Sequence, residues 1–145
     1  HIGEPMLDPT FRGVLLDYAE VEFLMAKANI GSAEDHYKAG ITASFEDWGV
    51  EGATDYLAKP EVAFSQDNLG KQFWIAMYNR GFEGWSVYRM FDGAIDFNLP
   101  ADTGNPIPTR FTYPVNEQTL NNANYDAASS AIGGDKQTTK IFWDN

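Results

Sequence analysis

The sequence contains no cysteine, few basic residues and no long apolar run. The lack of cysteine excludes disulfides, thiol catalysis and cysteine-ligated metal sites. Lys and Arg total 10 against 21 for Asp and Glu, which gives a formal net charge of −11. This charge argues against nucleic acid, whose phosphates require a basic surface, and against electrostatic binding to anionic lipid. No run approaches the ~18 apolar residues of a membrane-spanning helix. Neutral ligands such as sugars are compatible with all three absences.

The composition is otherwise typical of a globular, aromatic-rich protein. Apolar residues make up 43% and aromatic residues 14% of the 145 positions, a balance that disordered chains lack. This length suffices for one domain or for part of one. The chain starts with HIGEPMLD, without an initiator methionine, and we expect it to be a piece of a longer protein.

Two helix starts predict a helical hairpin over residues 16–48. Asp17 followed by Glu20 forms a capping box, and Ser32 is the next N-cap, directly after Gly31. A connection this short makes the two helices antiparallel. The predicted helices are 17–30 and 33–48.

Both helices of this hairpin carry apolar residues on more than one side. The first helix has two adjacent stripes: Leu16, Ala19, Phe23, Ala26 and Ile30, and then Val21, Leu24 and Ala28. Such a wide apolar arc predicts burial on two sides. The small–large pattern of the second helix is similar to a tetratricopeptide unit, yet only one unit is visible and about three are needed for stability. We therefore expect the N-terminal remainder of the chain, or a second copy, to cover the outer side.

A third, long helix is predicted over residues 65–92, with Ser65 as its N-cap. Two adjacent apolar stripes meet at Trp85, so Trp85 is expected to be mostly buried. Gly81 and Gly84 each cost roughly 1 kcal/mol in a helix interior. Their presence suggests that another backbone passes close by.

Residues 93–145 lack periodicity and are rich in proline, glycine and asparagine. They predict an irregular segment with at most a turn or two of helix near NEQTL and NYDAA. A segment this long is unusual inside a compact domain unless it lies over a surface. Its aromatic residues favour packing on the helices: Phe111, Tyr113, Tyr125, Phe142 and Trp143. The predicted fold class is therefore all-α, a tetratricopeptide-like helix pair plus a long helix, with a long irregular C-terminal segment.

Candidate catalytic and metal-binding residues are few. The acids that match glycoside hydrolysis by type alone are Glu46, Asp47, Glu83, Asp92 and Asp96. Surface charge and helix capping explain such acids more simply, because most acids in proteins are solvated. His36 is the one internal histidine and has no second histidine at metal spacing, which favours a surface or capping role. We assign no catalytic residue, no metal site and no cofactor, and expect a protein that is not an enzyme.

The aromatic residues of KQFWIAMYNRGFEGWSVYRMFDG, Lys71 to Gly93, allow two interpretations. Trp74, Phe82, Trp85 and Tyr88 recur at helical spacing. This spacing favours a packed core over a sugar-binding groove, which needs exposed ring faces.

Three arginines are expected to make structural contacts. Arg89 is one turn from Trp85 and can stack on it, and Arg80 can pair with Glu83. Arg110 can anchor a carboxylate or helix carbonyls with its five donors.

Five segments, in order, resemble the C-terminal part of SusD/RagB-like proteins, of the SusD-like subgroup common in Bacteroidetes. They are YAEVEFLMAKA, AEDHYKAGITASFEDWG, KQFWIAMYNRGFEGWSVYR, IPTRFTYPVNEQTLNNANY and GGDKQTTKIFWD. The resemblance covers nearly the whole chain after about Leu15. One departure is YRMFDG, where the family often has an Arg-Arg-Thr-Gly run, so that only Arg89 is kept.

This resemblance implies an all-α fold of tetratricopeptide-like helix pairs in a much longer protein. It also implies a lipoprotein on the outer face of the outer membrane, with its lipidated cysteine outside this segment. Such proteins capture glycans or other small nutrients and work with a SusC-type TonB-dependent transporter. Residues 1–145 are thus interpreted as the C-terminal part of a SusD-like domain, with no residue assigned to glycan binding. The alternative is a free-standing tetratricopeptide-like module that binds a peptide or protein.

Overall fold

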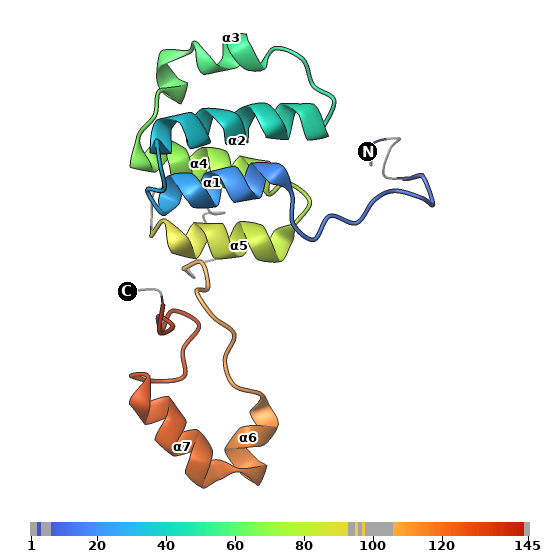
Figure 1. The fold of residues 1–145 in the computed structure, drawn as a ribbon. Coiled ribbons are helices and arrows are strands. Elements are labelled where there is room, and N and C mark those ends of the chain that lie inside the picture. The colour runs from blue at the N-terminus through green and yellow to red at the C-terminus, as the bar shows by residue number, and fades with distance from the viewer. Residues whose placement is uncertain (1–2, 4–6, 93–94, 96, 98–105, 144–145) are drawn as a thin grey trace. The chain divides into compact units, whose positions relative to one another are not determined.

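The computed structural model describes residues 3, 7–92, 95, 97 and 106–143. The chain divides into two compact units, His1–Val87 and Tyr88–Asn145, each with its own internal contacts. All regular structure within the described residues is helical (Figure 1). This confirms the predicted all-α fold class.

Most of the helices lie in the first unit. They are α1 (Tyr18–Lys27), α2 (Ala33–Asp47), α3 (Ala53–Leu57), the 3₁₀ turn η2 (Pro60–Val62), α4 (Gln66–Ala76) and α5 (Gly81–Met90). The last residues of α5 belong to the second unit. Helix α1 packs on α2, and α4 packs on both.

The hairpin of α1 and α2 starts at the predicted N-caps. The Asp17 carboxylate accepts a hydrogen bond from the Glu20 amide at 2.7 Å. The Ser32 hydroxyl accepts one from the Asp35 amide at 3.2 Å. Gly31 makes the turn between the helices with a φ of 66°, a conformation that glycine adopts without steric cost. The predicted hairpin is therefore confirmed.

The core of the first unit lies where α1, α2 and α4 meet. The Phe23 and Phe73 rings stack with centroids 5.2 Å apart, and Tyr37 meets Phe23 edge-on at 6.3 Å. The Tyr37 hydroxyl donates to the Val62 carbonyl at 2.8 Å, and burial raises the Tyr37 pKa to about 12. Gly40 admits the Phe23 ring to the surface of α2, because a Cβ there would lie 3.0 Å from three ring atoms. Gly40 thus allows close packing between α1 and α2.

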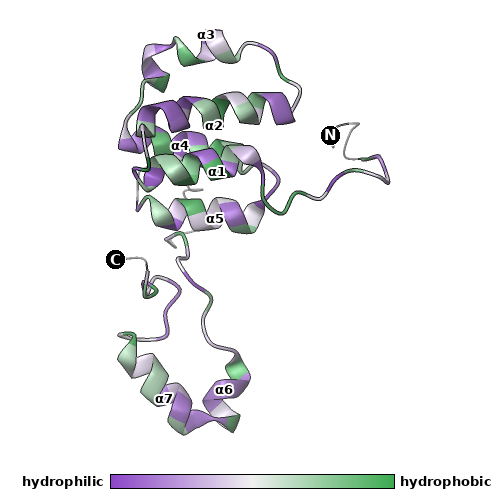
Figure 2. Cartoon of the chain, viewed as in Figure 1, coloured by the Kyte–Doolittle hydropathy of each residue, from purple (hydrophilic) through white to green (hydrophobic). Residues whose placement is uncertain are grey.

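The outer side of α1 is exposed within this chain, as expected if the remainder of the protein or a second copy covers it. The inner residues Ala19, Phe23 and Ala26 are at most 2% exposed, but Leu16 is 61%, Leu24 38% and Ile30 54% exposed. Figure 2 shows apolar and polar residues mixed along α1 and α2. Among the described elements, α2 and α4 cover one side of α1, so cover of the other side by the N-terminal remainder of the chain or by a second copy stays a prediction.

The predicted long helix over 65–92 is broken into α4 and α5. Ser65 caps the start as predicted, accepting from the Asn68 amide at 3.0 Å. The helix ends at Ala76, and Asn79 adopts a left-handed conformation with a φ of 65°. A left-handed residue cannot continue a right-handed helix, so the chain restarts at Gly81. Hydrophobic periodicity continues across this break, which is why the sequence pattern predicts a single helix.

Trp85 has intermediate burial, which agrees with the expectation that it is mostly buried. The suggestion of a close backbone at Gly81 is corrected, because among the described residues a Cβ there would meet nothing within 4 Å. At Gly84 the nearest atoms belong to Trp74 and Met77, at ordinary contact distances of 3.6 and 3.7 Å.

The second unit contains more helix than predicted. Helix α6 (Val115–Leu120) covers NEQTL, and α7 (Asn122–Ala131) covers NYDAA and extends over ten residues. Several residues of the predicted irregular segment 93–145 lie outside the described part of the chain. Its expected packing over the helices stays a prediction.

Asp135 organises the described part of the second unit. Its side chain is 4% exposed and accepts from Arg110 Nη1 at 2.7 Å and from the Tyr113 amide at 3.1 Å. Burial alone raises the pKa of Asp135, but the hydrogen bonds from Arg110 and Tyr113 outweigh it and hold this pKa below its ordinary value. The guanidinium of Arg110 also lies 4.9 Å from the Tyr113 ring centroid. Arg110 is therefore the structural anchor that the sequence predicted.

Candidate ligand-binding pocket

A pocket of about 580 Å³ lies within the first unit, where three helix ends meet. Residues 11–14 and Asp17 come from the segment that leads into α1. Residues 46–49 come from the end of α2, and Ala76 with 78–80 from the connection between α4 and α5. This volume falls in the range of ~300–1,000 Å³ found for small-molecule sites.

Aromatic rings form an apolar surface in this pocket. Trp48, the C-cap of α2, and Tyr78, just after α4, pack edge to face with centroids 5.5 Å apart. Trp48 is 39%, Tyr78 66% and Phe11 43% exposed. Gly49 turns the chain directly after Trp48 with a φ of 63°. The rings therefore hold each other in place while part of each remains accessible.

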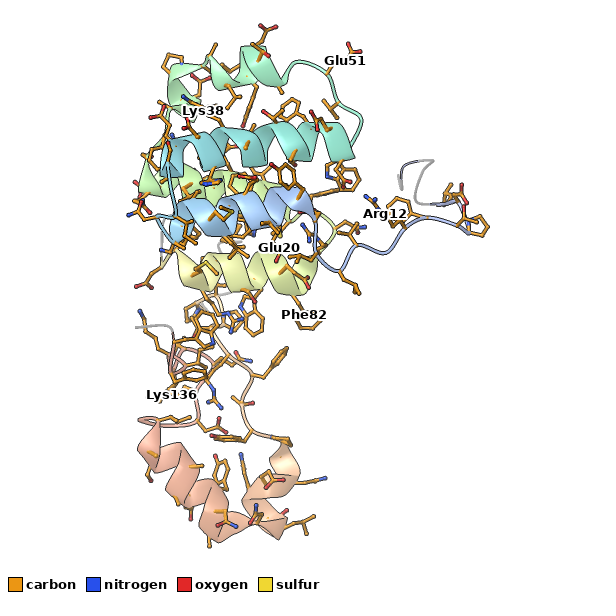
Figure 3. All side chains as sticks on the ribbon, in the orientation of Figure 1. Arg12, Glu20, Lys38, Glu51, Phe82 and Lys136 are labelled. Atoms are coloured by element: carbon orange, nitrogen blue, oxygen red, sulfur yellow. The ribbon has the colours of Figure 1, made fainter. Side chains whose placement is uncertain are left out.

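Arg80 closes one side of the pocket with two ion pairs. Its Nη2 lies 2.7 Å from Asp17 Oδ2, and its Nη1 lies 2.7 Å from Glu20 Oε2. Glu20 lies on α1 and is labelled in Figure 3. The Arg80 side chain is 9% exposed, and the two carboxylates are 15% and 16% exposed. Burial raises the pKa of Glu20 above its ordinary value, although the guanidinium acts in the opposite direction. Both terminal nitrogens of the Arg80 guanidinium thus have a carboxylate partner within the protein.

The remaining polar side chains of the pocket differ in whether another side chain of the protein binds them. Arg12, on the segment before α1 (Figure 3), donates from Nη2 to Asp47 Oδ1 at 2.6 Å. In contrast, Glu46 and Asn79 make no side-chain hydrogen bond or ion pair within the described part of the chain. The pocket therefore combines exposed rings, two neutralised arginines and at least two polar side chains that are available to a ligand.

Of the acids considered from the sequence, two line this pocket. Glu46 and Asp47 line the pocket, but Asp47 is paired with Arg12. Asp92 pairs instead with Lys140 at 2.9 Å in the second unit. Of the other two, Glu83 does not line the pocket, and Asp96 lies outside the described residues.

His36 contacts the neighbouring helix. Its Nδ1 lies 2.5 Å from Glu22 Oε2 on α1. The hydrogen bonds from Tyr18 and His36 hold the pKa of Glu22 below its ordinary value. Among the residues that the structure describes, no cluster of His, Asp or Glu is arranged to hold a metal ion.

Two of the arginines considered in the sequence make contacts that were not predicted. Arg89 stacks on Trp143, with its guanidinium 4.8 Å from a ring centroid, and donates to the Thr109 carbonyl at 3.2 Å, while its stacking on Trp85 stays a prediction. Arg80 pairs with the carboxylates of α1 instead of Glu83. The ring pair of Trp48 and Tyr78 was not predicted, because periodicity places both on apolar stripes; only their positions at helix ends signal exposure.

A family of proteins described as starch-binding and associating with the outer membrane has a sequence profile that matches residues 4–114. The chain belongs to this SusD-like family. The resemblance seen in the sequence is therefore confirmed. No curated protein matches the chain significantly. Within the described residues, no helix has both the length and the apolar character needed to cross a membrane.

Solved structures of SusD-like proteins share this fold. A SusD-like protein of Bacteroidetes AC2a aligns with a TM-score of 0.76 and 28% identity over 92% of this chain and 30% of its own. A chitin-binding SusD homologue from Flavobacterium johnsoniae aligns at 0.71 and 26%, over 90% and 36%. A structure described as a chitin-binding protein aligns at 0.71 and 31%, over 88% and 33%. The chain thus spans about a third of the length of these relatives.

Proposed function

We propose that this chain is the C-terminal part of a glycan-binding lipoprotein of the outer membrane. The observation that carries the proposal is the match of residues 4–114 to a starch-binding, outer-membrane-associated family. The alignment with chitin-binding proteins at 26% and 31% identity supports a polysaccharide-derived ligand. The family match also favours this function over a free-standing tetratricopeptide-like module.

The protein is proposed to bind its glycan without cleaving it and to deliver it to a SusC-type TonB-dependent transporter. Hydrolysis of a glycoside needs two carboxyl groups that flank the bond, one of them able to donate a proton. Asp47 and Asp92 are each held in an ion pair with a basic side chain. The excess of acidic residues suits a neutral ligand better than a phosphorylated one. In this proposal the lipid anchor is a cysteine outside this segment.

A glycan array tests the binding function with the intact natural protein. We expect retention on neutral glucan or chitin-type oligosaccharides, with no turnover of the bound sugar. An absence of binding across neutral glycans, or release of shorter sugars from a bound one, would contradict the proposal.

Affinity purification from detergent-solubilised outer membranes tests the partnership. The intact protein should co-purify with a TonB-dependent transporter. Recovery of the protein from the soluble fraction alone, without a transporter, would argue against this part of the proposal.

A further inference from the structure

We propose that the pocket at the ends of α1, α2 and α4 is a binding subsite for a short neutral oligosaccharide, with Trp48 and Tyr78 as its stacking surface. This inference rests on the proposed glycan-binding function and adds the residues and the ligand class. It is carried by three features of the pocket: its rings, its charge balance and the backbone that forms its wall.

The ring pair offers an apolar surface that is already ordered. Trp48 and Tyr78 fix each other edge to face at 5.5 Å, yet they are 39% and 66% exposed. A pyranose ring has one face of C–H groups, which packs on an aromatic face, and hydroxyl groups around its edge. Aromatic side chains with a polar tip suit such a ligand, because they supply apolar contact and a hydrogen-bonding group together. Little ordering of side chains is then required on binding, which favours affinity.

The charge balance of the pocket selects a neutral ligand. Its lining has two guanidinium groups, Arg12 and Arg80, and both are engaged by carboxylates at 2.6–2.7 Å. An anionic ligand would therefore find no available cation in the lining. Glu46 and Asn79, which have no partner in the described structure, supply acceptors and an amide donor for hydroxyl groups.

The connection between α4 and α5 forms one wall of the pocket. Tyr78, Asn79 and Arg80 are consecutive, and all three line the pocket. Side chains at successive positions of a continuous helix point in different directions. The break with Asn79 at a φ of 65° makes this shared lining possible. Left-handed conformations of residues other than glycine are uncommon and concentrate at functional sites.

Calorimetric titration of the intact protein with maltohexaose and chitohexaose tests this assignment. Trp48→Ala and Tyr78→Ala should each weaken binding of the preferred sugar by about tenfold or more, as expected when a central aromatic contact is removed. Phe82→Ala is the matched control. Phe82 is an aromatic of the same unit at the start of α5, 70% exposed and outside the pocket lining (Figure 3). Its removal should leave the affinity within about twofold.

A second variant tests whether the sugar binds beside residue 48 while an aromatic ring is kept at this position. Trp48→Phe should retain sugar binding but lose part of the tryptophan fluorescence change that accompanies it. This readout decides the question if an alanine variant does not fold.

The outcomes separate this inference from the proposed function. Normal binding by both alanine variants, or an unchanged fluorescence response in Trp48→Phe, would overturn the pocket assignment and leave glycan binding intact. Failure of the wild-type protein to bind either sugar would overturn this inference, and failure across a full glycan array would overturn the function as well.

Discussion

Replacement of Arg80 with alanine removes the cation that neutralises two carboxylates at the start of α1. Asp17 and Glu20 each lie 2.7 Å from the guanidinium and are 15% and 16% exposed. Loss of one partner of a buried ion pair costs about 3–5 kcal/mol, because the remaining charge is left without compensation. Since both carboxylates keep some contact with solvent, we expect Arg80→Ala to lower the free energy of unfolding by about 3 kcal/mol at neutral pH. Urea unfolding of the intact protein, followed by far-UV circular dichroism, measures this change.

The pH dependence of the stability of Arg80→Ala shows whether uncompensated carboxylates cause its loss of stability. In the wild type, burial already holds the folded-state pKa of Glu20 above its ordinary value. The folded state therefore binds the Glu20 carboxyl proton more tightly than the unfolded state does. The stability that Glu20 contributes is fully present at a pH below its ordinary pKa, and it is lost as the pH rises through the folded-state pKa. Without Arg80 the pKa of Glu20 should rise further. The difference in stability between wild type and variant should therefore shrink as the pH falls from 8 toward 5.

Lys38→Ala is the matched control for a lost cation. Lys38 pairs with Glu34 at 2.6 Å, but both side chains are about half exposed, at 49% and 53%. Exposed pairs of this kind contribute little to stability, so this variant should unfold like the wild type at every pH. An Arg80→Ala variant that also behaves like the wild type, or whose loss is equal at pH 5 and pH 8, would refute the reasoning.

Three further substitutions test separate parts of the structure. Gly40→Ala places a Cβ 3.0 Å from the Phe23 ring, and overpacking should lower stability by about 1–3 kcal/mol in urea unfolding; an unchanged midpoint would show that the ring moves aside freely. Asn79→Ala should be less stable than Asn79→Gly by about 1 kcal/mol, because the φ of 65° penalises a Cβ; equal thermal stabilities would contradict this. Asp135→Ala should increase proteolysis of the second unit by freeing Arg110. Because the pKa of Asp135 is lowered, wild-type protection should likewise be lost as the pH falls through its folded value, and a pH-independent cleavage rate would argue against that role.

Local signals in the sequence predicted the helix starts correctly. Asp17, Ser32 and Ser65 each accept a backbone amide hydrogen bond from a residue three positions later, an interaction that depends on neighbours in the chain only. The anchoring role of Arg110 was also predicted, since a guanidinium among apolar residues needs acceptors. The family resemblance supplied what these local rules do not contain, namely the fold family and the link to glycans.

The pocket was not predictable, because it depends on the way helix ends are brought together. Periodicity runs through Asn79 without interruption, which masks the helix end there, although asparagine tolerates the left-handed backbone that it adopts. Arg80 lies near Glu83 in sequence but pairs with residues more than fifty positions away. Trp48 and Tyr78 continue apolar stripes, yet they extend past the ends of α2 and α4 into an exposed position.

Sedimentation of the intact wild-type protein with insoluble starch and insoluble chitin tests the central claim most directly. This chain is proposed to be part of a glycan-binding SusD-like protein with an accessible site for neutral sugars. The protein should be depleted from solution by at least one of the two polysaccharides and released by the matching soluble oligosaccharide. Protein that stays in the supernatant with both polysaccharides, while remaining folded, would contradict the account.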